Sequence, residues 1–151
     1  MMYQLTHGPL LWFATQALHR NVSLLTIAML VAHITTAVVD NYVDIRWYDA
    51  VVPFLGLYSR LWLGVGAIAS DLLIAVAITS LVRQRLNHRR WRLIHLMSYL
   101  GWVLGVVHGL GIGTDSGTLW GMVISALSVG VVAAFGVLRV ATLVHERRIA
   151  A

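Results

Sequence analysis

The sequence predicts an all-α integral membrane protein, built as a four-helix transmembrane bundle. Of its 151 residues, 59% are hydrophobic and only 11% are charged, whereas a soluble domain carries about 25% charged residues. The mean hydropathy is +0.79. The apolar residues gather in four runs, each near the roughly 20 residues that a helix needs to cross a bilayer. So much apolar surface cannot be hidden in one small core, and we expect a lipid bilayer to be its main partner.

Charge and cysteine content exclude several classes of function. The formal net charge is +5 and there is no lysine, so the basic excess consists of arginine. These arginines stand at the ends of the apolar runs, where they set the orientation of spans rather than bind a polyanion. Nucleic acid is therefore not an expected partner. The absence of cysteine excludes disulfides, cysteine nucleophiles and thiolate-held iron–sulfur clusters.

Residues 1–17 are expected to form an N-terminal interfacial segment. Gly8 and Pro9 interrupt its start, and the apolar stretch Leu10–Leu18 is too short to span a bilayer by itself. A helical extension of the next segment is the alternative. A cleavable signal peptide is not expected, because no basic residue precedes the stretch and the apolar run continues past it.

Four spans follow in residues 18–151, which form the membrane domain. The loop after the first span carries Asp40, Asp44 and Asp49, and around Trp47 it favours a short helix at the membrane surface, where Trp and Tyr prefer to lie. The third span contains three glycines that permit close packing, namely Gly101, Gly105 and Gly109. The expected spans are roughly Leu18–Val39, Leu61–Val82, Trp91–Gly111 and Leu119–Val144.

The arginines also predict the orientation in the membrane. Four spans place both termini on one side. That side holds Arg20, the five arginines of residues 83–92, Arg147 and Arg148, whereas the other side holds Arg46 and Arg60 together with the acidic loop. Because cytoplasmic loops carry an excess of Lys and Arg, we expect both termini to be cytoplasmic, in the inner or plasma membrane of the cell.

Two of the expected spans each carry two histidines. His19 and His33 are 14 residues apart, which is about 21 Å along a helix and returns to within about 40° of one face. His95 and His108 lie on the third span, which runs in the same direction as the first. The orientation therefore places His19 and His95 near the cytoplasmic face, and His33 and His108 near the opposite face.

Histidines at matched depths predict metal-centred cofactors held between the first and third spans. An imidazole inside a membrane is costly and indicates function, and two axial imidazoles make a haem iron a six-coordinate electron-transfer centre. We therefore expect two b haems, one above the other, each ligated by two of the four histidines. A lone buried histidine has a hydrogen-bonded structural role at least as often, and this remains the alternative for each one. Arginines suited to the anionic haem propionates are Arg20, Arg83 and Arg92 at one level and Arg46 and Arg60 at the other.

The second histidine pair raises a geometric difficulty. His95 and His108 are 13 residues apart, so on a straight helix they point about 140° away from a common face. A kink, a π-bulge or a strong crossing of the two helices is needed to bring both toward the first span.

The pattern resembles the ferric reductase-like transmembrane domain family. The resemblance rests on the spacing His-x13-His, followed two helices later by His-x12-His, and on the stretches Leu18–Asn21, Ala32-His33 and His108–Gly111. This family includes NADPH oxidases, ferric-chelate reductases and the haem subunit of bacterial methionine sulfoxide reductase systems. The match covers roughly residues 17–145, although family members commonly have further N-terminal helices and many carry a cytoplasmic flavin and nicotinamide domain.

The resemblance implies a transmembrane electron conduit, a component of an oxidoreductase that is not self-sufficient. Electrons would come from a separate cytoplasmic flavoprotein or a membrane quinol, and would pass to an external acceptor such as ferric iron, oxygen or a partner protein. Two alternatives stay open. One is a quinol-oxidising cytochrome b in which Asp71 takes protons, and the other is a non-catalytic membrane subunit that scaffolds a larger complex.

Overall fold

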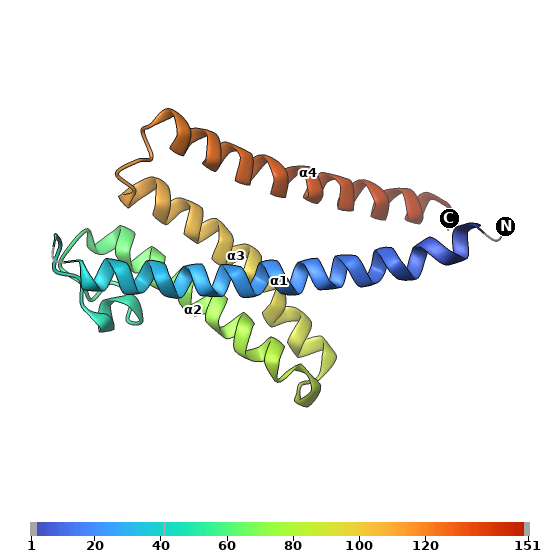
Figure 1. Ribbon diagram of the computed structural model, residues 1–151, viewed down its shortest axis with the longest axis horizontal. Helices are drawn as coiled ribbons and strands as arrows, with labels where there is room; N and C mark the ends of the chain where they lie inside the picture. Colours follow the sequence, from blue (N-terminus) through green and yellow to red (C-terminus); the bar gives the residue numbers. More distant parts are fainter. Residues whose placement is uncertain (1–2, 41, 150–151) are drawn as a thin grey trace. The chain divides into compact units, whose positions relative to one another are not determined.

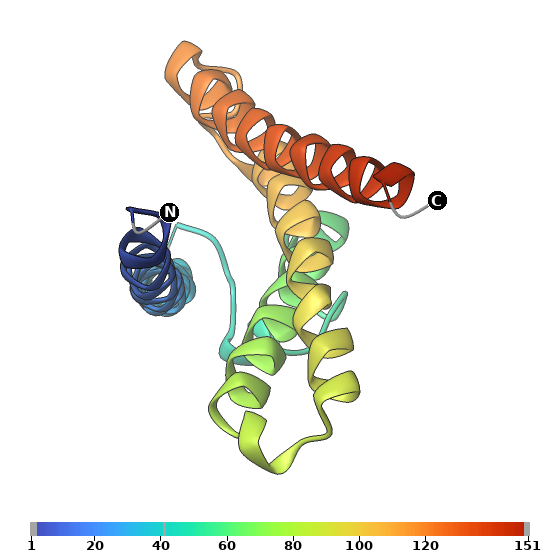
Figure 2. The same ribbon diagram turned by 90° about the vertical axis from the view of Figure 1, so that its right-hand side faces the viewer.

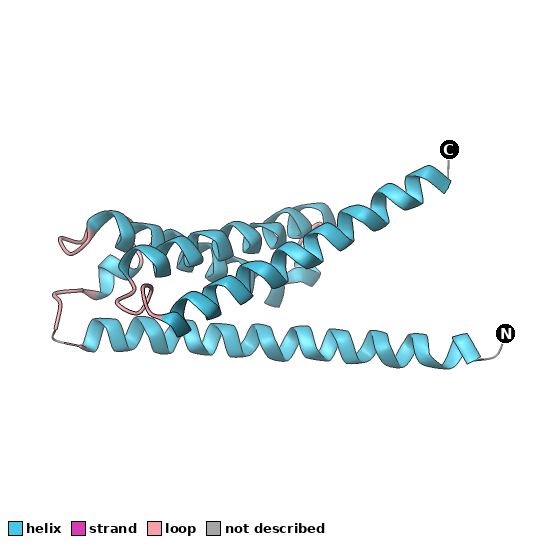
Figure 3. Cartoon of the chain, turned by 90° about the horizontal axis from the view of Figure 1, so that it is seen from above, coloured by secondary structure: helices cyan, strands magenta, loops and turns pink. Residues whose placement is uncertain are grey.

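The computed structural model describes residues 3–40 and 42–149, and within these residues every regular element is helical. Figure 3 shows the helices in cyan and the loops in pink. Four α-helices and two short 3-10 helices follow one another along the chain. Their bounds are α1 Tyr3–Val39, η1 Trp47–Ala50, α2 Arg60–Leu81, η2 Arg83–Arg85, α3 His88–Ile112 and α4 Leu119–Ile149.

All four α-helices are long and apolar enough to cross a membrane. The qualifying stretches are Leu11–Val39, Arg60–Leu81, His88–Ile112 and Leu119–Thr142. They overlap the four spans expected from the sequence, but the first begins seven residues earlier than predicted, at Leu11, and the third begins three residues earlier, at His88. The all-α class and the four-helix count are therefore confirmed.

The N-terminal residues join the first span in one helix. α1 is 37 residues long, or about 55 Å at 1.5 Å per residue, and it continues through Gly8 and Pro9 without a break. This is the helical extension that the sequence left open. A proline at this place removes one backbone hydrogen bond, which a long helix can tolerate. Residues 1 and 2 lie outside the described part, and the interfacial location of residues 1–17 stays a prediction.

The chain divides into two compact units, residues 1–108 and 109–151. In the first unit, α2 and α3 form a hairpin closed by η2, and α3 runs obliquely across α1 (Figure 1). Figure 2 views α1 end-on beside this hairpin. The second unit contains the end of α3, the loop that follows it and α4. The Thr118 hydroxyl accepts a hydrogen bond from the Gly121 N–H at 3.2 Å, which caps the start of α4.

Small residues build the contact between α2 and α3. Ala69 of α2 and Gly101 of α3 are both buried where the two helices meet. A Cβ at Gly101 would lie 3.3 Å from Leu73 Cγ and 3.5 Å from the Ala69 carbonyl oxygen. Close approach of backbones through small residues is the usual way in which helices pack in lipid, so the close packing predicted for Gly101 is confirmed. At Gly105 and Gly109 no atom of the described residues lies within 4 Å of the Cβ position.

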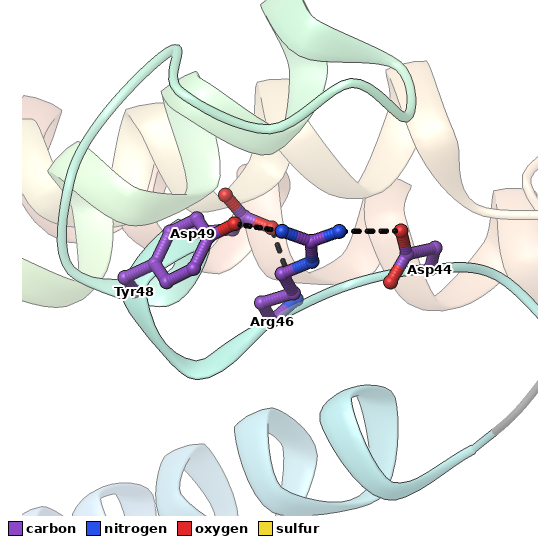
Figure 4. A network of polar contacts seen from close by, with 4 residues as sticks. All are labelled: Asp44, Arg46, Tyr48 and Asp49. Atoms are coloured by element: carbon purple, nitrogen blue, oxygen red, sulfur yellow. Dashed lines mark hydrogen bonds and ion pairs between the residues drawn. The ribbon is translucent and has the colours of Figure 1, made fainter.

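The loop between α1 and α2 has its own polar network. Arg46 donates from its guanidinium to the Tyr48 hydroxyl at 2.6 Å and to Asp44 Oδ2 at 3.3 Å (Figure 4). These partners raise the pKa of the Arg46 guanidinium above its usual value, with the bond to Tyr48 as the larger cause. The Arg46 backbone N–H donates to Asp49 Oδ2 at 2.9 Å, which holds the start of η1. The short helix expected around Trp47 is thus present, and it packs on α2.

Candidate haem-ligating histidine pairs

The four histidines singled out by their spacing meet in two pairs across α1 and α3. The ring centroids of His19 and His95 are 6.0 Å apart, with an angle of 73° between the ring planes. Those of His33 and His108 are 6.3 Å apart, with an angle of 80°. The pairing is the one expected from the sequence, and each ring of α1 faces one ring of α3.

The ring spacing has the size that a shared metal atom requires. A metal–imidazole bond is about 2 Å and the ring centre lies about 1 Å beyond the nitrogen, so two imidazoles on opposite sides of one metal have centroids about 6 Å apart. Both measured separations match this value. Among the described residues no three His, Asp or Glu side chains gather into a metal site. Two-histidine ligation of haem does not need such a group, because the macrocycle supplies the remaining nitrogens.

The oblique course of α3 resolves the difficulty of the 13-residue spacing. All described residues of α3 are in α-helical conformation, with no π-helical turn, so a π-bulge is not the explanation. Because α3 crosses α1 at a slant (Figure 1), α1 lies on different sides of α3 at the two levels. Residues on different faces of α3 can therefore both turn toward α1, so the crossing of the two helices accounts for both pairs without a π-bulge.

His108 is held by the backbone of α2. Its Nδ1 lies 2.8 Å from the Trp62 carbonyl oxygen, and a carbonyl can only accept, so the hydrogen sits on Nδ1. The other nitrogen, Nε2, then carries the lone pair that a metal ligand needs. The ring rests on Gly66, where a Cβ would lie 2.5 Å from Nδ1.

His95 has a different surrounding. Its ring stacks on Trp91, with centroids 5.0 Å apart and 24° between the planes, and Trp91 in turn lies 5.8 Å from the ring of His88. Among the described residues, the buried Nδ1 of His95 and the buried Nε1 of Trp91 have no hydrogen-bond partner. The two half-buried histidines of α3 are therefore supported in two different ways.

Three of the five arginines proposed for haem propionates lie on the helices that carry or contact the histidine pairs, and their role at propionates stays a prediction. Arg20 follows His19 on α1, and Arg92 lies on α3 within one turn of His95; both are exposed. Arg60 begins α2, and its Nε donates to the Phe54 carbonyl at 2.5 Å. Of the other two candidates, Arg46 is engaged by Tyr48 and Asp44, and Arg83 is exposed in η2.

Sequence reasoning missed three contributors to these pairs. Trp62 contacts His108 through its backbone carbonyl, a contact that does not depend on its side chain. Gly66 and Trp91 had no assigned role. Gly66 could not be predicted, because it lies in an apolar run rich in small residues. Trp91 could have been, because a residue one helical turn before His95 lies on the same face of the helix and can stack on it.

One family model matches the chain, and it covers residues 1–115 with the description of a domain of unknown function, DUF8596. No curated protein and no solved structure matches. The matched range contains α1, α2, α3 and all four paired histidines.

Proposed function

We propose that this chain, which belongs to the family of the domain of unknown function DUF8596, is a transmembrane electron conduit that holds two b haems between α1 and α3. The observation that carries the proposal is the pairing of four histidines from the same two helices, at ring separations of 6.0 and 6.3 Å. When bound, haem supplies one-electron chemistry through its iron. The electron donor would be a cytoplasmic flavoprotein or a membrane quinol, and the acceptor would lie on the opposite side.

The residues of the chain have separate roles in this proposal. His19 and His95 hold one haem, and His33 and His108 hold the other. The 14 residues between the two histidines of α1 separate the two levels by about 21 Å along the helix, most of the roughly 30 Å hydrocarbon thickness. Arg20 and Arg92 neutralise propionates at the first level. Arg60 does so at the second, since a guanidinium has five N–H donors and its bond to Phe54 uses one.

The resemblance to the ferric reductase-like family supports the same assignment. It rests on the histidine spacings and adds the expectation of an external acceptor, either ferric iron, oxygen or a partner protein. The orientation with both termini in the cytoplasm comes from the distribution of arginine. The described residues form helices only, with no strand–turn–helix that could bind a dinucleotide, so these residues do not themselves supply the nicotinamide site of a donor.

The test is haem content measured variant by variant. The purified protein should show Soret and α bands that shift on reduction with dithionite, and about two haems per chain. Replacing His19 or His95 by Ala should leave about one haem, and so should replacing His33 or His108. His145→Ala is the matched control, because this exposed histidine on α4 belongs to neither pair, and this variant should keep both haems.

Two results would contradict the proposal. A colourless protein, purified from cells with ample haem, would favour the scaffolding alternative. Full retention of both haems in any one of the four variants would remove that histidine from the ligand set.

A further inference from the structure

His108 is the best fixed of the four paired histidines. The 2.8 Å contact from its Nδ1 to the Trp62 carbonyl fixes both the tautomer and the direction of the ring. A hydrogen-bond acceptor on the other ring nitrogen is the usual partner of a metal-ligating imidazole, and it raises the basicity of the ligating nitrogen.

Gly66 makes this contact possible. It lies four residues after Trp62, on the same face of α2, and the His108 ring occupies the place where a side chain would begin. A Cβ at Gly66 would lie 2.5 Å from Nδ1, 2.6 Å from Cε1 and 3.0 Å from Cγ of His108. The first two distances are shorter than real Cβ contacts, so a side chain at position 66 requires the His108 ring to shift away from its place beside the carbonyl.

The His19–His95 pair has no equivalent arrangement. The buried Nδ1 of His95 has no hydrogen-bond partner among the described residues, and its ring is supported by stacking on Trp91. Stacking fixes the plane of a ring but accepts no hydrogen from it. The two histidines that α3 contributes therefore differ in the one contact that changes the electron density of an imidazole.

We propose that Gly66 and the Trp62 carbonyl are positioning residues that orient His108 and lower the reduction potential of the haem it ligates, making this site the lower in potential of the two. The inference rests on the proposed function. A more basic imidazole stabilises ferric iron over ferrous iron, and hydrogen bonding around a ligand is one of the levers that set a haem potential. The expected distribution of charge acts in the same direction, since most arginines belong to the His19–His95 level, whereas the other level has Arg46 and Arg60 together with the aspartates of the loop.

The experiment uses the full chain in detergent and spectroelectrochemical titration. His19→Ala leaves the His33–His108 haem alone, and His33→Ala leaves the His19–His95 haem alone. The first variant should titrate at a lower midpoint potential than the second. Gly66→Ala is then added to His19→Ala, with Gly130→Ala as the control, because a Cβ at Gly130 of α4 meets no atom within 4 Å among the described residues.

The expected result is a rise in midpoint potential, or loss of the remaining haem, with Gly66→Ala but not with Gly130→Ala. Full haem content with an unchanged potential would overturn the role of Gly66. A higher potential in His19→Ala than in His33→Ala would overturn the order of the two sites. Either failure in a protein that binds two haems leaves the proposed function standing, whereas a wild-type protein without haem would remove both.

Discussion

Two glycines of α2, Gly64 and Gly66, each carry an aromatic ring directly against the helix backbone. At Gly64 the ring is that of Phe54, whose φ of 63° places it in the left-handed region that a bulky residue rarely adopts. The bond from Arg60 Nε to the Phe54 carbonyl and the seat on Gly64 together hold this conformation. On one helix, Gly64 thus positions the loop through Phe54, and Gly66 positions the candidate ligand His108.

Gly64→Ala should destabilise the protein by about 1–3 kcal/mol, the usual range for overpacking a filled site. The added methyl group would collide with the Phe54 ring and force the loop away from α2. Thermal unfolding in detergent, compared with Gly130→Ala, measures the effect. Equal melting temperatures for the two variants would show that Phe54 does not rely on Gly64.

Among the elements, α3 shows which features could be predicted from the sequence and which could not. The positions of His95 and His108 on one span were sufficient to predict their partners on α1, because depth follows from residue number at a fixed rise. The number of helices and their approximate ends also followed from apolar length. Which of the three solutions brings both histidines toward α1 was not predictable, since helix crossing depends on packing between α1, α2 and α3 and not on the α3 sequence alone.

The contact between His108 and the Trp62 carbonyl lay beyond sequence reasoning for a related reason. A backbone acceptor leaves no trace in residue identity, and every residue of α2 offers one. Only the three-dimensional approach of α3 to α2 selects Trp62, and the glycine at position 66 that permits this approach does not stand out among the small residues of α2.

The first turns of α3 carry positive charges that destabilise the helix. Arg89, Arg90 and Arg92 lie in its first turns, where the positive end of the helix dipole opposes cations. Asn87 partly compensates, because its side-chain oxygen accepts from the Arg89 N–H at 2.9 Å and so caps the helix. Cations retained at an unfavourable place indicate a role outside helix stability, either in orienting the span or in binding an acidic surface.

Neutralising Arg85, Arg89 and Arg90 to Gln should slow haem reduction by a protein donor with an acidic surface. Electrostatic steering raises association rates about 10-fold or more, and screening removes most of this gain at high salt. Stopped-flow reduction at low and high salt measures it, and reduction by dithionite is the control that should not change. A rate unaffected at low salt would place the donor elsewhere.

At the scale of the whole molecule, the expected topology divides most of the charges between the two ends of the spans. Arg20, the arginines of residues 83–92 and Arg147 belong to one side, and Asp40, Asp44 and Asp115 belong to the other. Because cytoplasmic loops carry an excess of Lys and Arg, this asymmetry predicts the orientation of the spans.

A reporter fused after Ala151 should therefore behave as cytoplasmic, and a tag inserted at Asp115 should be accessible from outside intact cells. The matched control is a variant in which the excess of arginine is transferred to the opposite side of the membrane. Gln at the five arginines of residues 83–92, combined with added arginines near Asp115, should weaken or invert the labelling. Inverted labelling in the unaltered protein would reverse the sides assigned to the two histidine pairs.

The histidine pairs also bear on how long the protein survives in a cell. In the candidate membrane span of α1 no residue is buried by the rest of the protein, whereas 22% of the residues in that of α2 are buried. Lipid provides no hydrophobic force to hold one helix on another. α1 is synthesised first and must wait for α3 before either pair can close. Haem ligated by one histidine of each helix would hold α1 against α3. A chain made during haem starvation should therefore leave the two helices unpaired and be degraded early. A pulse-chase experiment with and without haem synthesis should find a shorter half-life for the starved protein, and no such difference for a His19→Ala, His33→Ala double variant, which is open in both conditions.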